Sequence, residues 1–469
     1  MLRAVARPLV NLVERWMPDA LVFAIVLTFV VALMALGLTD STPLEVLRGW
    51  GDGLAGLLEF IAQIAIVLVL GHTLAHTGPV ERMLRNIARF PRTPAMAYAF
   101  VTVIAGLASL ISWALGLIVG GIVAFEVARV ARSRGIRLHY PLLVACAYSG
   151  YVVWHMGYSG SGPLAAATPG SFLEELEFGL VPVTQTTFSA WNIAAAAATL
   201  AAVTVAMVLL RPRGEDPIVE LAEKAVTNER SGTTARSDDL PRADSPVPPG
   251  GAPEDHAAPP SPAERVDGSR LLTLALGAAL VAYLVVYFAQ EGFALTLDIV
   301  NWSFLAAILL LVSSPRELVG LITNAGRTVG NVLLQYPLYA GILGMMTATG
   351  LVDVLSGFFV SISTPATLSV WAMISGGIVN MFIPSGGGQF AVQGPIFLQA
   401  AQELGTDPAP VIMGIAYGDQ WTNMIQPFWT IPLLAIAGLT VRDIMGYTTI
   451  TLFVSGAVML ATLLLVGAG

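Results

Sequence analysis

The fold is decided by one interrupted stretch, Asn380-Met381-Phe382-Ile383-Pro384-Ser385-Gly386-Gly387-Gly388-Gln389, which lies inside apolar sequence. Pro384 and the three glycines after Ser385 cannot continue a helix without leaving backbone N–H and C=O groups unpaired. Unpaired backbone is tolerated at membrane depth only where it is buried in protein or lines a cavity. The flanking segments, 367–383 and 389–402, are short for membrane spans. We therefore predict a re-entrant hairpin whose tip lines a cavity. The matching stretch Ser112-Trp113-Ala114-Leu115-Gly116, with the short segments 94–111 and 112–128, predicts a second hairpin of this kind in the first half.

The sequence around this stretch is typical of an all-α polytopic membrane protein. Of its 469 residues, 55% are hydrophobic and 12% are charged, whereas roughly a quarter are charged in soluble domains. The mean hydropathy is +0.74. Four runs without Asp, Glu, Lys or Arg approach or exceed the ~20 residues that cross a bilayer as a helix. These runs are 20–38, 187–210, 271–288 and 444–469.

A charged, proline-rich stretch divides the apolar sequence. Residues 212–268 contain six basic residues, twelve acidic residues and ten prolines, so they supply most of the net charge of −8. Such a composition indicates a disordered linker. We predict a first membrane repeat at 1–211, a disordered cytoplasmic linker at 212–268, an extra transmembrane helix at 269–290 and a second membrane repeat at 291–469.

The two predicted repeats match each other at a nearly constant offset. Thr77-Gly78-Pro79-Val80-Glu81 falls on Thr349-Gly350-Leu351-Val352-Asp353, and Gln63 falls on Gln335, both at an offset of 272. The loop after Thr77 holds four arginines, whereas its counterpart holds an aspartate and no arginine. Because one extra span would reverse the second copy, we predict inverted-topology repeats. Such repeats are typical of alternating-access transporters, although duplicated channels also exist.

Arginine predicts the orientation of the chain. Clusters at 82–92 and 129–137 should be cytoplasmic by the positive-inside rule, and the acidic segment 171–186 should face outward. Arg3, Arg7 and Arg15 precede the first span, so we expect a multi-pass protein with a cytoplasmic N-terminus.

Each repeat also carries a predicted broken helix. The interruptions are 148–163 and 417–427. Together with the hairpin tips they offer hydroxyls, amides and exposed backbone N–H groups, although small residues can also serve helix packing alone. The predicted substrate-binding residues are Ser112, Trp113, Ser159, Gly160, Ser161, Asn380, Ser385, Gly386, Gly387, Gly388, Gln389, Asn423 and Gln426.

Asp419 and His155 are the candidate coupling residues. A charge at bilayer centre costs ~2.5–3.5 kcal/mol even on the lenient scale, so an acid in an apolar segment indicates cation or proton coupling. The alternatives are an interfacial aspartate and a packing histidine. No Lys or Arg occurs from 138 to 210, and Arg442 alone occurs after 327. An anionic substrate would therefore depend on helix N-termini, hydroxyls and amides, with a co-transported proton or sodium ion.

The motifs resemble the short-chain fatty acid transporter family, the bacterial acetoacetate and butyrate permeases, within the wider ion transporter superfamily. The resemblance runs nearly end to end and is carried by Arg15-Trp16-Met17-Pro18-Asp19, Tyr158-Ser159-Gly160-Ser161, Ala166-Ala167-Thr168-Pro169-Gly170, Pro384-Ser385-Gly386-Gly387-Gly388, Gly418-Asp419-Gln420-Trp421 and Val441-Arg442-Asp443-Ile444-Met445-Gly446-Tyr447. It implies uptake of short-chain monocarboxylates across the inner (plasma) membrane, and it suggests the superfamily's plan of hairpins and broken helices, commonly in a homodimer. Symport itself is predicted from the lack of buried basic residues noted above. The chain departs from the family's glycine-rich pattern at His155 and Met156.

Other functions remain as alternatives. A transporter of another small carboxylate and a passive anion channel both fit the same features. A membrane enzyme is not expected, because no HExxH, GxSxG or metal-spaced His/Cys cluster is present. No nucleic-acid partner, further cofactor or metal site is expected either; the expected partners are the carboxylate and the lipid bilayer.

Overall fold

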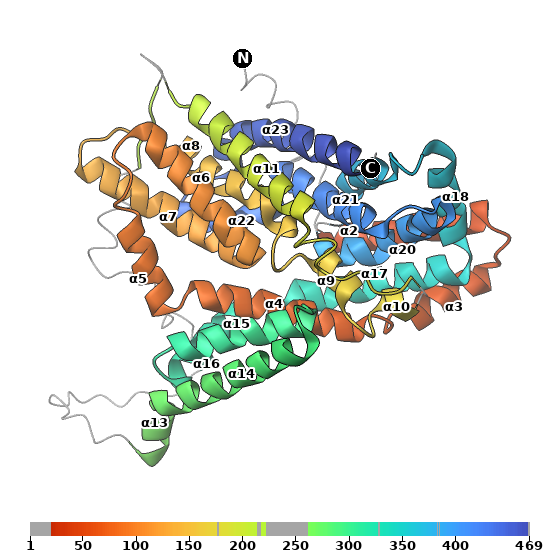
Figure 1. Ribbon diagram of the computed structural model, residues 1–469, viewed down its shortest axis with the longest axis horizontal. Helices are drawn as coiled ribbons and strands as arrows, with labels where there is room; N and C mark the ends of the chain where they lie inside the picture. Colours follow the sequence, from red (N-terminus) through yellow and green to blue (C-terminus); the bar gives the residue numbers. More distant parts are fainter. Residues whose placement is uncertain are drawn as a thin grey trace, which may run out of the picture.

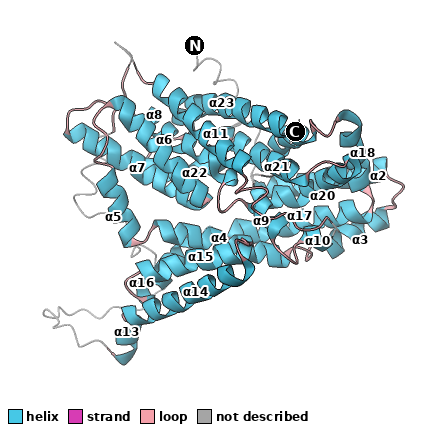
Figure 2. Ribbon diagram, viewed as in Figure 1, coloured by secondary structure: helices cyan, strands magenta, loops and turns pink. Residues whose placement is uncertain are grey.

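The computed structural model describes residues 20–175, 178–212, 217–221, 261–326, 329–381, 383 and 385–467. Every regular element in these ranges is a helix (Figure 1, Figure 2). Residues 1–19, most of the predicted linker, and Phe382 and Pro384 at the hairpin tip lie outside the described residues.

The first half contains helices that precede the linker. They are α2 (Ala20–Leu38), α3 (Pro43–Gly53), α4 (Leu58–Ala75), α5 (Gly78–Ile87), α6 (Pro94–Ile111), α7 (Trp113–Ser133), α8 (Tyr140–Gly150), the 3₁₀ helix η1 (Tyr151–Met156), α9 (Ser161–Ala167), α10 (Phe172–Glu175) and α11 (Ala190–Leu209).

The second half follows α13 (Pro262–Asp267), at the end of the predicted linker, and α14 (Arg270–Glu291), at the place of the predicted extra helix. Its helices are α15 (Leu297–Leu311), α16 (Pro315–Gly326), α17 (Gly330–Ala348), α18 (Leu351–Ile362), α19 (Leu368–Asn380), α20 (Gly386–Leu404), α21 (Pro408–Thr422), the 3₁₀ helix η2 (Asn423–Ile425), α22 (Pro427–Ala437) and α23 (Val441–Gly467). Helices α3 to α9 and α16 to α22 follow one another in the same order. The inverted orientation of the two copies stays a prediction.

Six of the described helices are long and apolar enough to cross a membrane. They are α4, α6, α7, α11, α14 and α23. A seventh crossing is formed if α17 and α18, which meet at 80°, are counted as one bent span. The four predicted apolar runs correspond to α2, α11, α14 and α23. The prediction of an all-helical polytopic membrane protein is confirmed.

Both predicted hairpins are interrupted at the expected place. Ser112 alone separates α6 from α7, and its backbone is extended, with φ −155° and ψ 135°. In the second half, 381–385 separate α19 from α20. Helices α6 and α7 pack against each other, as α19 and α20 do. Because α6 and α7 are each long enough to span a bilayer, the re-entrant character of this hairpin stays a prediction.

The two predicted broken helices are also interrupted. In the first half α8 passes into η1, and a short loop precedes α9; in the second half α21 passes into η2 and then α22. Gly150 ends α8 so close to α6 that an added Cβ would lie 2.7 Å from the backbone nitrogen of Gly106. A glycine at this crossing lets the broken helix lie directly on the hairpin.

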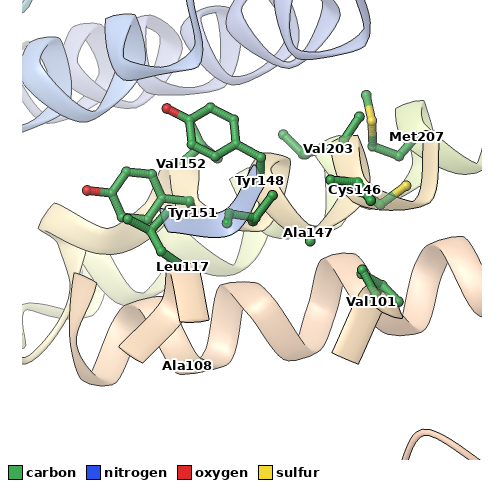
Figure 3. Packing of buried hydrophobic residues seen from close by; sticks show 14 of the residues in the cluster. Val101, Ala108, Leu117, Cys146, Ala147, Tyr148, Tyr151, Val152, Val203 and Met207 are labelled. Carbon is green, nitrogen blue, oxygen red and sulfur yellow. The ribbon is translucent and has the colours of Figure 1, made fainter. Parts of the chain in front are cut away.

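The cavity described below lies between two groups of packed helices. Helices α4, α15 and α17 run along one side of the molecule, and α6, α7, α8, α11 and α23 along the other (Figure 1). Figure 3 shows the core of the second group, where Tyr148, Tyr151 and Cys146 pack with side chains of α6, α7 and α11. Cys146 is fully buried and packs as a small core residue.

Candidate substrate-binding site

A cavity of about 340 Å³ lies where the hairpin tips and broken helices of both halves meet. Its wall comes from α4, α7, η1, α17, the start of α20 and the start of α22. Six predicted residues line it: Trp113, Ser159, Ser161, Ser385, Gly386 and Gly387. The sequence motifs that are far apart in the chain therefore come together around one cavity.

The N-terminus of α20 forms one wall. Ser385 is the N-cap residue, and its hydroxyl accepts a hydrogen bond from the Gly388 backbone N–H at 3.4 Å. The Tyr336 hydroxyl lies 2.5 Å from the Ser385 hydroxyl. The first N–H groups of a helix have no partner within the helix, and here they belong to Gly386 and Gly387. Hydroxyls and free amide donors therefore meet at one point of the wall.

Gly386 joins the second hairpin to the first broken helix. An added Cβ would lie 2.7 Å from Ser161 Oγ and 2.9 Å from Asp419 Oδ2. Only a residue without a side chain fits between these groups. Gly388, by contrast, faces away from the wall: an added Cβ there would meet the Tyr339 ring at 2.5 Å.

The first hairpin meets the same broken helix. The Trp113 backbone N–H donates to Ser159 Oγ at 3.2 Å, and the Trp113 ring packs edge-on against Trp429 with centroids 5.2 Å apart. Ser112 is buried against α4 and does not line the cavity. Gly160 caps α9, and its place beside the His155 carbonyl, 2.6 Å from an added Cβ, explains a glycine there.

His155 and Asp419 form a buried pair behind the cavity wall. His155 Nδ1 lies 2.9 Å from Asp419 Oδ2, and each side chain is 1% exposed. His155 Nε2 accepts a hydrogen bond from the Gly162 backbone N–H at 3.1 Å. Because Nε2 is an acceptor here, the ring proton of a neutral His155 is on Nδ1 and is donated to Asp419.

This pair is connected to the cavity on both sides. Ser161 Oγ lies 3.4 Å from His155 Nε2, and the His155 ring stacks on Trp154 at 4.1 Å. Ser161 and Trp154 both line the cavity. A change in the protonation of the pair would therefore reach the cavity wall directly.

Four predicted amide residues lie outside the cavity wall and instead hold the second hairpin to the second broken helix. The Asn380 amide donates to the Asp419 carbonyl at 2.7 Å, and the Gln426 amide donates to the Asn380 carbonyl at 2.5 Å. The Asn423 amide donates to Gln426 Oε1 at 3.2 Å. Gln389 joins α20 to α19 through the Gly376 carbonyl at 2.9 Å. The structure thus places these residues as supports of the wall.

Several residues that line the cavity were not predicted from the sequence. They include Trp154, Tyr336, Trp429 and His72. The described lining contains no Lys or Arg, so His72 is its one side chain that can become a cation. His72 stacks on His76 with ring centroids 4.4 Å apart. Tyr336 follows Gln335, which matches Gln63 in the repeat. This match is a sequence signal that could have indicated α17.

Comparison with known proteins identifies the family. Residues 1–466 match the profile of the family described as short chain fatty acid transporter. The chain belongs to this family. This match confirms the resemblance seen in the motifs. The family is one of transporters and not of enzymes.

Two relatives carry the same family name. The chain is 40% identical over 458 residues to one from Escherichia coli (strain K12), covering 98% of both proteins. It is 38% identical over 453 residues to one from Haemophilus influenzae, covering 95% of this chain and 96% of the relative.

Solved structures share the fold of this short-chain fatty acid transporter family member. The YdaH transporter of Alcanivorax borkumensis, whose topology is described as unusual, superposes with a TM-score of 0.59 at 14% identity over 96% of this chain and 98% of its own. The MtrF protein of Neisseria gonorrhoeae superposes with a TM-score of 0.50 at 13% identity, covering 97% of each chain. These similarities concern the fold alone.

Proposed function

We propose that the chain is a secondary active transporter that takes up short-chain monocarboxylates such as butyrate and acetoacetate, in symport with a cation. The substrate binds in the cavity of about 340 Å³ between the two halves. This volume is near the lower end of the roughly 300–1,000 Å³ of small-molecule sites, which suits a small acid.

The substrate carboxylate lies at the N-terminus of α20 in this proposal. The observation that carries it is the meeting of Ser385, Tyr336 and the free amides of Gly386 and Gly387 on a wall without Lys or Arg. A helix N-terminus supplies about half a positive charge together with oriented N–H donors. The short alkyl tail then packs against the apolar and aromatic part of the wall, which includes Leu68, Trp113 and Trp429.

The coupling ion that the geometry favours is a proton bound by His155 and Asp419. A proton added at His155 Nε2 would turn the acceptor of the Gly162 N–H into a second donor, so this hydrogen bond would be lost. The beginning of α9, where Ser161 lines the cavity, would then be released. Protonation of the pair and the shape of the site are linked in this way.

Alternating access in this proposal depends on the two inverted repeats, 1–211 and 291–469, with 269–290 as the extra span between them. The cavity is built from both halves, as expected for a site at a repeat interface. The chain lies in the inner membrane with its N-terminus in the cytoplasm, and the family resemblance favours a homodimer.

Uptake into proteoliposomes tests the proposal. Purified full-length protein is reconstituted, and uptake of labelled butyrate and acetoacetate is measured with a proton gradient or a sodium gradient imposed separately. We expect accumulation driven by the proton gradient. Loss of a hydroxyl that binds an anion costs about 1.5–3 kcal/mol, so Ser385→Ala should weaken apparent affinity roughly 10- to 100-fold. Asp419→Asn should abolish accumulation.

Two matched variants serve as controls. Ser455→Ala removes a buried hydroxyl that bonds within α23, and Asp443→Asn neutralises an exposed capping aspartate; both should transport normally. Equilibration without accumulation would indicate a channel instead. Accumulation driven by sodium alone would support a secondary transporter but exclude the proton as its coupling ion. Normal uptake by Ser385→Ala and Asp419→Asn would reject the site.

A further inference from the structure

A second, basic cavity lies away from the substrate site, between α5 and the C-terminal end of α7. Its volume is about 910 Å³. Figure 1 shows α5 at the edge of the molecule, where the chain passes from α4 to α6. Six arginines line this basic groove: Arg82, Arg85, Arg89, Arg129, Arg132 and Arg134.

Two of the six arginines are neutralised within the protein. Arg85 lies 3.6 Å from the Glu81 carboxylate, one turn earlier on α5. Arg129 makes a 2.5 Å contact with Glu126, which is 5% exposed. The carboxylates of Glu81 on α5 and Glu126 on α7 are therefore already paired with arginines.

Three arginines have no carboxylate partner among the residues that the structure describes. Arg134 donates to the backbone carbonyls of Arg89 at 2.9 Å and Pro91 at 3.2 Å, which fixes its position without neutralising it. Arg82 and Arg89 make no side-chain hydrogen bond or salt bridge with another described residue. Like charges held in one groove repel each other, so a bound anion would remove an unfavourable interaction.

Exposed apolar side chains border the charged groove. Phe90 is 63% exposed and Met83 is 53% exposed. The Phe90 ring packs on Phe100 of α6 with centroids 5.8 Å apart, beside Arg89. The groove lies at the C-terminal end of α7, which is long enough to span a bilayer, so we expect it at the depth of lipid headgroups. Aromatic and basic side chains together at that depth are typical of lipid contact.

We propose that the basic groove binds the phosphodiester headgroup of an anionic membrane phospholipid. Arg82, Arg89 and Arg134 donate to the phosphate oxygens, for which the planar guanidinium is well suited. The acyl chains lie along Met83 and Phe90. The positive-inside rule explains why arginines are near this surface, but it does not require a hollow bordered by the exposed side chains of Met83 and Phe90.

Thermal unfolding of the purified full-length protein in neutral detergent tests this inference. Dioleoylphosphatidylglycerol, dioleoylphosphatidylcholine and inorganic phosphate are added in separate titrations. We expect phosphatidylglycerol to raise the unfolding midpoint in a salt-dependent manner, whereas phosphatidylcholine and inorganic phosphate do not. At low salt, the triple variant R82Q/R89Q/R134Q should need on the order of a hundredfold more phosphatidylglycerol to reach half of this rise in the midpoint.

A matched triple, R48Q/R270Q/R316Q, removes the same number of exposed arginines away from the groove and should keep the full effect. The double variant R82Q/R89Q removes side chains that have no partner among the described residues, so it should fold even where the triple does not, and it should also lose binding. Undiminished binding by the groove variants, or an equal loss in the matched triple, would overturn the inference. An equal midpoint rise with inorganic phosphate would assign the groove to free phosphate instead of lipid.

Discussion

At the scale of single residues, one glycine lies at a close contact between the two halves in the wall of the candidate site. Gly386 fits between Ser161 Oγ and Asp419 Oδ2, which an added Cβ would approach to 2.7 and 2.9 Å. Real Cβ atoms essentially never come this close to another heavy atom. Asp419 is held by His155, so it cannot move away without breaking the buried pair.

Replacing Gly386 by alanine should therefore lower the initial rate of carboxylate uptake by about tenfold or more, because overpacking a filled site costs about 1–3 kcal/mol. Gly394→Ala in the same helix is the control, since an added Cβ would meet only the Phe390 ring at 3.5 Å and beyond. Equal uptake by the two variants in proteoliposomes would show that the contact at Gly386 is unimportant for transport.

Glycine and proline predicted the location of this site because they interrupt a helix whatever surrounds them. Sequence could not predict which way side chains point. Asn423 and Gln389 were predicted to contact substrate, but the structure places them in bonds that hold the wall together. Trp154 and Tyr336 were missed, since an aromatic residue in an apolar run has no feature that separates a cavity wall from a core.

At the scale of helices, a glycine at a corresponding place in each half lets the broken helix lie on the hairpin of that half. Gly150 of α8 faces α6, and Gly418 of α21 faces α19, where an added Cβ would lie 2.7 Å from the Gly377 backbone nitrogen. The two glycines are 268 residues apart, close to the offset of the predicted repeat. The same packing device therefore occurs in both halves.

Alanine at Gly150 or at Gly418 should push backbone against backbone and lower stability by about 1–3 kcal/mol. The measurement is the thermal unfolding midpoint of the purified protein in detergent. Gly357→Ala in α18 is the control, because no atom lies within 4 Å of an added Cβ there. A midpoint for either variant as high as that of the control would contradict this account of the crossing.

The interruptions were predictable, but their exact form was not. The 3₁₀ helices η1 and η2 depend on hydrogen bonds with distant residues, such as that from the Tyr148 hydroxyl to the Asn423 carbonyl at 2.7 Å. The first hairpin was expected to end at residue 128, whereas α7 continues to Ser133. Its last turns are supported by the ion pair of Arg129 with Glu126, and single-residue propensities do not report such pairs.

At the scale of the whole molecule, the order of helices in the two halves agrees with the predicted repeat, and α14 has no counterpart in the first half. Sequence offsets and loop charges predicted this organisation. They could not predict which faces of the halves meet, because that depends on packing between residues hundreds of positions apart. The contact of Gly386 with Ser161 is such a case.

Inverted copies should present equivalent positions on opposite sides of the membrane. Glu81 in the first turn of α5 and Asp353 in the first turn of α18 are equivalent by the offset of 272. In a Cys146→Ala background, which removes the sole natural thiol, Asp353→Cys should react with a membrane-impermeant maleimide in intact cells. Glu81→Cys should react only in inside-out vesicles. Labelling of both from one side would rule out the inverted arrangement.

The absence of Lys and Arg from the described cavity wall also affects how long a bound molecule stays. A helix end and a few hydroxyls offer a shallow energy well, so departure does not require the rupture of a full ion pair. We expect such a carrier to have low affinity and fast substrate release, which suits nutrients present at high concentration. Saturation of uptake at only low micromolar butyrate would be inconsistent with so shallow a well.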